Sequence, residues 1–122
     1  MPCSDSSGKS NVNRGREYEQ LAADYLSKQG FEIVARNHQE GHLEIDIIAR
    51  DQTSLVFVEV KAAATSNYGH PSEWVDARKQ ERLVRAAESY LQKYPQPGLD
   101  LRFDVITFVK GKLEHYPNAF GV

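Results

Sequence analysis

The chain has a single cysteine, Cys3, and no long apolar run. One cysteine cannot form an internal disulfide or a cysteine-based zinc site, so we expect a reducing, cytoplasmic setting. No apolar stretch approaches the ~18 residues that a membrane-spanning helix needs. The first ten residues, MPCSDSSGKS, also lack the apolar segment of a secretory signal. The sequence therefore predicts a protein with no membrane partner.

A strong excess of charge of either sign is missing as well. The formal net charge is −2, and the 122 residues are 40% hydrophobic and 26% charged. This length and mixture are typical of one soluble globular domain. The low net charge argues against a surface coated with positive potential. It remains compatible with a nucleic-acid binder, because a carboxylate site and a separate basic stripe would cancel in the sum.

The hydrophobic pattern predicts a single domain over residues 13–122, preceded by a disordered tail over residues 1–12 that is rich in Ser, Asn and Gly. A helix is expected from Asn13, a favourable N-cap, to Gln29. A second helix is expected over residues 75–93, with Leu83, Ala86, Ala87, Tyr90 and Leu91 toward the core. The core residues expected in the first helix are Tyr18, Leu21, Ala22, Tyr25 and Leu26.

Alternating or continuous apolar residues predict the strands. Their expected ranges are 31–36, 42–50, 55–62, 101–109 and 112–116. In the second of them, Leu43, Ile45, Ile47 and Ala49 are expected to share one face. The third is almost wholly apolar and should lie centrally, covered on both faces. The order of helices and strands predicts the α/β class, with a sandwich built around a mixed sheet.

Glu59 and Lys61 interrupt the apolar strand over residues 55–62 and lie on one face of it. Burial of these charges is unfavourable by several kcal/mol unless they are paired, bound to a metal or exposed in a cleft. If the preceding turn is centred on residues 52–53, Asp46 lies opposite Glu59 and Glu44 lies opposite Lys61. Two opposed carboxylates repel each other, which favours a divalent cation between them.

All-oxygen ligation favours Mg²⁺ or Mn²⁺ over zinc, and Lys61 would hold a water or a developing negative charge. Glu19 lies at the margin of the first helix's core stripe, where it can lean over the sheet toward Asp46. The alternatives are an ordinary solvated strand face with a cross-strand ion pair and, for Glu19, a solvated helix edge. The sequence leaves these alternatives open.

A basic stripe runs along the second helix, where Arg78, Arg82 and Arg85 recur at helical spacing with Lys79 beside them. Such a stripe can neutralise phosphates of a nucleic acid. The alternative, favoured by base rate, is a solvated outer face paired with Glu81 and Glu88.

These residues resemble the PD-(D/E)xK signature of restriction-endonuclease-like nucleases and, more closely, the YraN-like family of small bacterial proteins. The resemblance covers nearly everything after the tail. Its matching positions are Gly15-Arg16-Glu17-Tyr18-Glu19, Ala22, Tyr25, Leu26, Gly30, Arg36-Asn37, Glu44-Ile45-Asp46, residues 56–61, Tyr68-Gly69-His70-Pro71, Lys79, Arg82, Arg102-Phe103-Asp104-Val105 and residues 115–120.

The resemblance implies a three-layer α/β/α sandwich whose central mixed sheet is restriction-endonuclease-like. In similar nucleases the residues matching Asp46 and Glu59 bind Mg²⁺ with help from the carbonyl at the Val60 position. The residue matching Lys61 aids the attacking water, and the one matching Glu19 completes the site, much as in archaeal Holliday-junction resolvases.

Two functions follow as hypotheses. The first is a Mg²⁺-dependent DNA endonuclease, a hydrolase acting on branched or Holliday-junction DNA. In it Glu44 would tether Lys61, and Arg78, Lys79 and Arg82 would hold the backbone. Cleavage of a junction would favour a two-fold homodimer. The second is a catalytically inactive nucleic-acid-binding or protein-interaction module on the same fold.

Departures from the family pattern bear on the second hypothesis. Tyr18 and Leu43 stand where relatives usually have glycine. Residues 62–64 are alanines where relatives tend to be basic, which weakens the expected grip on a phosphate backbone.

Overall fold

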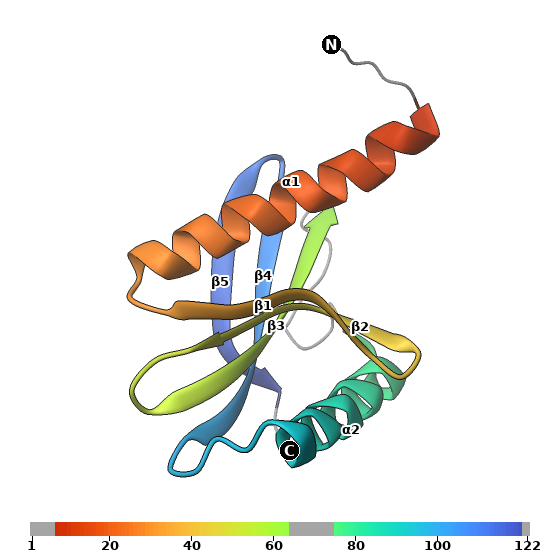
Figure 1. Ribbon diagram of the computed structural model, residues 1–122. Coiled ribbons are helices and arrows are strands. Elements are labelled where there is room, and N and C mark those ends of the chain that lie inside the picture. Colours follow the sequence, from red (N-terminus) through yellow and green to blue (C-terminus); the bar gives the residue numbers. More distant parts are fainter. Residues whose placement is uncertain (1–6, 64–74, 121–122) are drawn as a thin grey trace.

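The computed structural model describes residues 7–63 and 75–120, with side chains from Gly15 onward in the first helix (Figure 1). The elements follow the predicted order of helices and strands. They are α1 (Ser7–Lys28), β1 (Glu32–Glu40), β2 (Leu43–Arg50), β3 (Ser54–Ala63), α2 (Ala77–Lys93), β4 (Asp100–Val109) and β5 (Lys112–Phe120).

The five strands form one mixed sheet in the order β1-β2-β3-β4-β5. Only the central pair, β3 and β4, is parallel, and α2 lies in the crossover connection that a parallel pair requires. Figure 1 shows α1 and α2 on opposite faces of the sheet. The α/β class and the three-layer arrangement are therefore confirmed.

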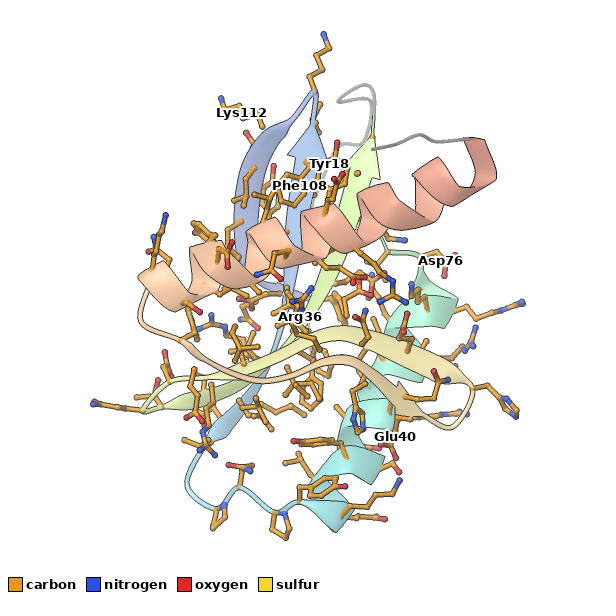
Figure 2. The ribbon with its side chains drawn as sticks, turned by 45° about the horizontal axis from the view of Figure 1, so that its top comes forward. Tyr18, Arg36, Glu40, Asp76, Phe108 and Lys112 are labelled. Atoms are coloured by element: carbon orange, nitrogen blue, oxygen red, sulfur yellow. The ribbon has the colours of Figure 1, made fainter. Side chains whose placement is uncertain are left out.

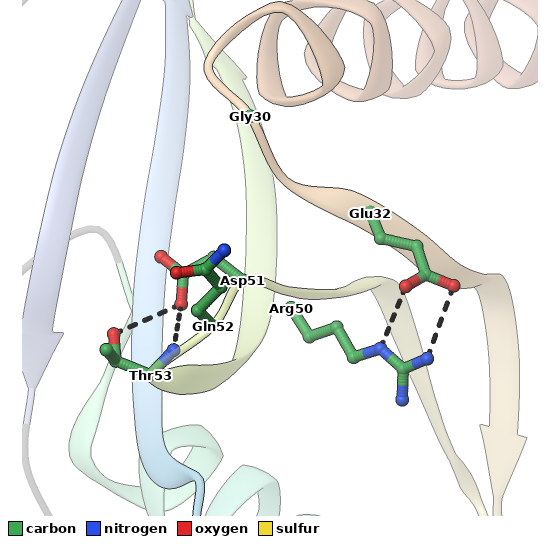
Figure 3. Close-up of a pocket in the computed structure, with 6 residues that line it drawn as sticks. All are labelled: Gly30, Glu32, Arg50, Asp51, Gln52 and Thr53. Atoms are coloured by element: carbon green, nitrogen blue, oxygen red, sulfur yellow. Dashed lines mark hydrogen bonds and ion pairs between the residues drawn. The ribbon is translucent and has the colours of Figure 1, made fainter.

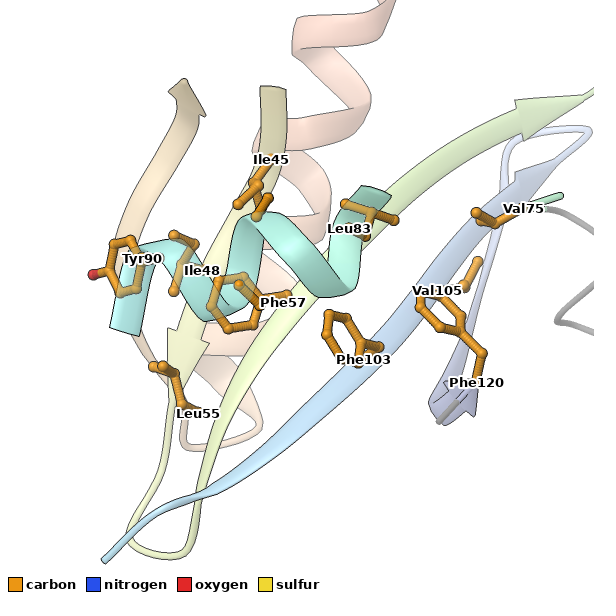
Figure 4. Close-up of a cluster of buried hydrophobic side chains, with 12 residues drawn as sticks. Ile45, Ile48, Leu55, Phe57, Val75, Leu83, Tyr90, Phe103, Val105 and Phe120 are labelled. Atoms are coloured by element: carbon orange, nitrogen blue, oxygen red, sulfur yellow. The ribbon is translucent and has the colours of Figure 1, made fainter. Parts of the chain in front are cut away.

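Each helix closes a separate hydrophobic cluster. Leu55 and Phe57 of β3 pack in the α2 cluster with Tyr90 (Figure 4), whereas Val56 and Val58 pack in the α1 cluster. This confirms that β3 is covered on both faces. The predicted core residues of α2 are also confirmed: Leu83, Ala86, Ala87 and Tyr90 are buried, and Leu91 packs beside them.

Two predictions for the first helix are wrong. The helix begins at Ser7 rather than Asn13, so residues 7–12 are helical rather than part of a tail. No proline interrupts this stretch, and extending an existing helix forms one hydrogen bond for each residue that is ordered. Leu21 is 52% exposed, because the buried stripe runs through Ala22 and Leu26 and Leu21 lies roughly a third of a turn away.

Several strands are longer than predicted. β1 continues to Glu40, and β5 continues past Pro117 to Phe120. β5 lies at the edge of the sheet, where a proline is tolerated because its missing N–H need not face a partner strand. The sequence also favours a loop over residues 63–74, of which Ala63 is the last residue of β3, while residues 64–74 and residues 1–6 of the predicted tail lie outside the described residues. No helix in the described part of the chain is long and apolar enough to cross a membrane.

A buried hydrogen-bond network ties the far half of the sheet to α1. The Asp104 carboxylate, with 0% of the residue exposed, accepts two hydrogen bonds of 2.9 Å from Arg102 and one of 2.9 Å from the Asn118 amide. It also pairs with His115 Nε2 at 2.7 Å, and His115 Nδ1 lies 3.1 Å from the Tyr25 hydroxyl of α1. Burial opposes ionisation of Asp104, but the hydrogen bonds outweigh it and hold the pKa of this carboxyl below its ordinary value.

A second buried carboxylate ties β1 to the end of α2. Glu40 accepts hydrogen bonds from Ser89 at 2.6 Å and Lys93 at 2.8 Å, and its other oxygen lies 2.9 Å from His38 Nε2. Figure 2 shows Glu40 beside the last turns of α2. Hydrogen bonds from Lys93, Ser89 and His38 lower the pKa of Glu40 to about 2.

The Asp104 network is expected to stabilise the fold. Asp104→Ala leaves Arg102 and His115 without their buried partner, so the free energy of unfolding should fall by about 3–5 kcal/mol. The measurement is the urea-unfolding midpoint. Glu32→Ala is the control, because its 2.9 Å pair with Arg50 is largely exposed and contributes at most about 1 kcal/mol. Equal losses in the two variants would contradict the prediction.

Glu40 is expected to make the fold acid-sensitive. Its pKa is lowered from 4.5 to about 2, so its contribution to stability is complete above pH 4.5 and is lost as the pH falls toward 2. Thermal unfolding of wild type and Glu40→Gln over this range should show a shallower decline in the variant. Glu88→Gln, an exposed change on α2, should follow the wild type. Parallel curves for wild type and Glu40→Gln would refute this role.

Candidate functional site

The hairpin of β2 and β3 has the predicted register. Backbone partners run from Arg50–Leu55 to Ile47–Val58, which is the pairing expected from a turn centred on residues 52–53. The pairing ends at Ile47 and Val58, one residue short of Asp46 and Glu59. There the Asp46 carboxylate Oδ2 accepts the Val60 amide at 2.9 Å. Where the backbone pairing of β2 and β3 ends, the Asp46 side chain therefore accepts the hydrogen bond from β3 in place of a backbone carbonyl of β2.

The alternation of β2 changes at Asp46, so the prediction of one shared apolar face is wrong. Leu43 and Ile45 pack with the α2 cluster, whereas Ile47 and Ala49 pack with the α1 cluster. Asn37 of β1 lies opposite Asp46, because Arg36 pairs with Ile47 and His38 pairs with Ile45. Asn37 has a φ of 50°, a left-handed conformation that Asn adopts more readily than most residues. We attribute the change of face to this local distortion.

Glu59 lies in the α2 layer with only 5% of its side chain exposed. Its Oε2 accepts a hydrogen bond of 2.6 Å from Lys79 of α2 and lies 3.5 Å from the Lys61 ammonium. Its Oε1 is buried and has no hydrogen-bond partner among the described residues. The two oxygens are therefore unequal: one is held by lysines, and the other is buried without a donor from the described residues.

Asp46 is close enough to two other carboxylates for their charges to act on it. Burial, then the negative charges of Glu59 and Glu19, raise the pKa of Asp46 to about 7 from its usual 3.8. The Val60 amide and Lys79 oppose this shift without cancelling it. The convergence of the acids predicted from the sequence is thus present.

Glu19 is oriented by a neighbour on β1. Its Oε1 accepts a hydrogen bond of 2.7 Å from the Asn37 side-chain amide, whose oxygen accepts one of 3.3 Å from Arg16. Glu19 is half-buried on the side of α1 that faces the sheet. The alternative of a solvated helix edge therefore does not hold.

Of the remaining predicted residues, Glu44 does not make its expected contact, whereas Arg78 and Arg82 lie where the prediction places them. Glu44 is exposed, and Lys61 pairs with Glu59 rather than with Glu44, so the expected Glu44–Lys61 tether is not formed. Arg78 and Arg82 are exposed on α2 as a phosphate-binding stripe requires.

Lys79 instead reaches into the carboxylate site, a placement that sequence reasoning missed along with the contact of Asn37 to Glu19. The available signal for Asn37 was its place among the positions that match the family, since the predicted first strand ended at residue 36.

The oxygen atoms at this site suit a hard divalent cation. No three Asp, Glu, His or Cys side chains in the described ranges group tightly enough to hold a metal ion by themselves. A metal would therefore rest on Asp46 and Glu59 with a backbone oxygen, for which the Val60 carbonyl remains the prediction. The unpartnered Oε1 of Glu59 and the mutual repulsion of the carboxylates fit such a cation.

A hollow of about 500 Å³ lies at the turn between β2 and β3, at the end of the hairpin away from Asp46 and Glu59 (Figure 3). Its polar groups already bond to one another: Arg50 pairs with Glu32 at 2.9 Å, and Asp51 accepts the Thr53 amide at 2.9 Å. The polar groups around this hollow are thus used by the hairpin turn itself. None of the predicted site residues lines the hollow.

Comparison with known proteins then places the chain. The model of the uncharacterised protein family UPF0102 matches residues 18–108. The chain belongs to this family. The match confirms the YraN-like resemblance and includes Glu19, Asp46, Glu59, Lys61 and Lys79 within its span.

Relatives of similar length support the assignment. A UPF0102 protein of Chlorobium phaeobacteroides (strain BS1) is 44% identical over 116 residues, covering 87% of this chain and 92% of the relative. One from Desulfosudis oleivorans is 46% identical over 109 residues, covering 87% and 88%. One from Persephonella marina is 38% identical over 107 residues, covering 88% and 92%.

Among solved structures, Pyrococcus furiosus SfsA in complex with Ca²⁺ is similar at 12% identity, with a TM-score of 0.34. It covers 92% of this chain and 65% of that one.

The raised pKa of Asp46 predicts a pH-dependent instability without metal. Because its folded pKa of about 7 exceeds the ordinary 3.8, ionisation opposes folding increasingly as the pH rises from about 4 to about 7. Asp46→Asn removes the charge and keeps an acceptor for the Val60 amide. In EDTA the variant should melt higher than wild type at pH 8, and this advantage should vanish near pH 4. A variant that melts lower at pH 8 would contradict the carboxylate repulsion.

Proposed function

We propose that this protein is a divalent-metal-dependent phosphodiesterase that cleaves DNA. The observation that carries the proposal is the pairing of Asp46, whose pKa burial and neighbouring carboxylates raise, with Glu59, whose buried Oε1 has no partner in the described part of the chain. A fold that held two acids together only for stability would be expected to supply each oxygen with a donor.

In this proposal Asp46 and Glu59 hold Mg²⁺ or Mn²⁺ together with the Val60 carbonyl. A metal bound there lowers the pKa of a coordinated water and offsets negative charge on the phosphate. Asp46 is oriented by the Val60 amide, and Glu59 is oriented by Lys79. Glu19, fixed by Asn37, adds negative charge beside Asp46 and is placed to orient water.

The two lysines take different roles. Lys79 makes a short hydrogen bond of 2.6 Å to Glu59 Oε2, whereas Lys61 stands 3.5 Å from the same oxygen. The longer contact leaves the Lys61 ammonium free to bind a water or a phosphate oxygen, as expected of the lysine in an acid-x-lysine nuclease motif. Lys79 keeps Glu59 Oε2 occupied, so that Oε1 faces the ligand.

The alternative is a binding module without chemistry. The Lys79–Glu59 ion pair favours it, because a buried carboxylate that already has a cationic partner is partly neutralised without a metal. Metal titration separates the two readings. A cation that binds the folded state stabilises it by mass action, by about 2.7 kcal/mol at a concentration of 100 Kd.

Cleavage is expected to depend on both the metal and the acids. With Mg²⁺ or Mn²⁺ the wild type should cleave labelled linear or branched DNA, and Asp46→Ala should lose more than the about 10–100-fold seen when a group beyond the metal ligands is removed. The same variant should lose the rise in melting temperature that Mn²⁺ gives the wild type.

Glu81→Gln is the matched control, because Glu81 is an exposed carboxylate on α2. It should keep both cleavage and the Mn²⁺-dependent stabilisation. Equal cleavage by wild type and Asp46→Ala would remove these acids from catalysis. Stabilisation by Mn²⁺ without cleavage of any DNA would favour the binding module. The homodimer expected for junction cleavage remains a prediction.

A further inference from the structure

One flank of α2 holds buried carboxylates at both of its ends. Near its start Lys79 bonds to Glu59 of the candidate site at 2.6 Å. Near its end Ser89 and Lys93 bond to Glu40 of β1 at 2.6 and 2.8 Å. These contacts fix the start of this flank against β3 and its end against β1.

Between these two anchors lies a hollow of about 270 Å³. Its lining residues are Glu40, Gly41, His42, Leu43, Arg82, Arg85, Ala86 and Ser89. The volume is just below the roughly 300–1,000 Å³ of pockets that enclose drug-sized ligands. It therefore suits one small flat group and is too small for a helix or a folded partner.

The charged residues at its rim are available for an anion. Arg82 is exposed and makes no ion pair with any described residue. Arg85 has only a 3.8 Å contact to Glu81, and both side chains are about two-thirds or more exposed, which makes this a weak pair. Glu40 in the floor is already neutralised by Lys93. The hollow thus presents guanidinium groups without a competing free carboxylate in its lining.

The other walls suit a base rather than a second phosphate. Ala86 is buried and Leu43 is half-buried, which provides an apolar surface, and the exposed His42 ring stands at the hairpin tip. Unstacked bases bind on aromatic rings, including His, and on arginine planes. The combination of an apolar wall, a ring and two arginines matches a nucleotide better than it matches an inorganic anion.

The hollow lies one step along α2 and β2 from the candidate site. Arg82 follows Lys79 by three residues, about 4.5 Å along the helix axis. Leu43 precedes Asp46 by three residues on β2. Successive nucleotides of one strand are about 3.4 Å apart along a duplex axis. A strand with a phosphate at Asp46 and Glu59 would therefore place its neighbouring nucleotide here.

We propose that the hollow between the β1–β2 hairpin and α2 binds one unpaired nucleotide adjacent to the scissile phosphate, with its phosphate on Arg82 and Arg85 and its base against His42 and Leu43. This inference rests on the proposed nuclease function, because the position of the nucleotide is counted from a DNA phosphate bound at Asp46 and Glu59. It assigns the substrate class as DNA with an unpaired strand beside the cleavage point rather than uninterrupted duplex.

The test is a binding measurement in EDTA, where cleavage does not occur. Fluorescence anisotropy compares a blunt duplex, the same duplex with a short unpaired extension, and that extension with its bases removed. Wild type should bind the extended duplex about tenfold more tightly than the blunt one, the effect of roughly one stacked base. Base removal should abolish the gain. His42→Ala and Arg82→Ala should each lose most of it.

Lys112→Ala is the matched control, because it removes one exposed positive charge from β5, away from α2 (Figure 2). It should keep the gain from the extension, as should Arg82→Lys in part. The proposal is overturned if wild type binds blunt and extended duplex equally, if it binds neither, or if His42→Ala and Arg82→Ala keep the full gain.

A separate cleavage assay with Mg²⁺ keeps the two proposals distinguishable. Cleavage without any gain from the extension would overturn the nucleotide site and leave the nuclease proposal standing. A gain that depends on His42 and Arg82 without cleavage would support the nucleotide site and count against the nuclease.

Discussion

The repulsion between Asp46 and Glu59 organises this end of the molecule. The register of a tight hairpin brings the two strands' carboxylates together at the point where backbone pairing stops. Burial and like charge then make full ionisation unfavourable, which is why the pKa of Asp46 rises to about 7. Lys79 of α2 offsets part of this charge through its ion pair with Glu59. The remaining imbalance is the negative charge that the proposed cation would offset.

The order of the elements and the hairpin register could be predicted from sequence, because each depends on local patterns. Alternation identified β2, continuous apolar residues identified β3, and the polar turn between them set the register that placed Asp46 near Glu59. The family motifs pointed to the same acids. For these features, short-range rules and the final packing agree.

The contacts that complete the site could not be predicted, because they come from tertiary structure. Ile45 and Ile47 lie on opposite faces of the sheet, opposite the left-handed Asn37 of β1, and the hydrophobic periodicity of the sequence does not predict this irregularity. Lys79 looked like one of several exposed basic residues, yet it alone of that stripe reaches Glu59. Leu21 was misplaced because the burial of α1 is centred on Ala22 and Leu26, and only the packed sheet decides that rotation.

The chain order of the charged groups has a consequence for how the protein forms. Glu19, Asp46 and Glu59 all precede Lys79, so a ribosome releases the acids before the lysine that makes the shorter ion pair with Glu59. In the nascent α1–β3 segment only Lys61, 3.5 Å from Glu59 in the finished fold, is present to offset these acids, until α2 adds the closer contact of Lys79. A divalent ion bound to these carboxylates would reduce their repulsion during synthesis, before Lys79 is in place.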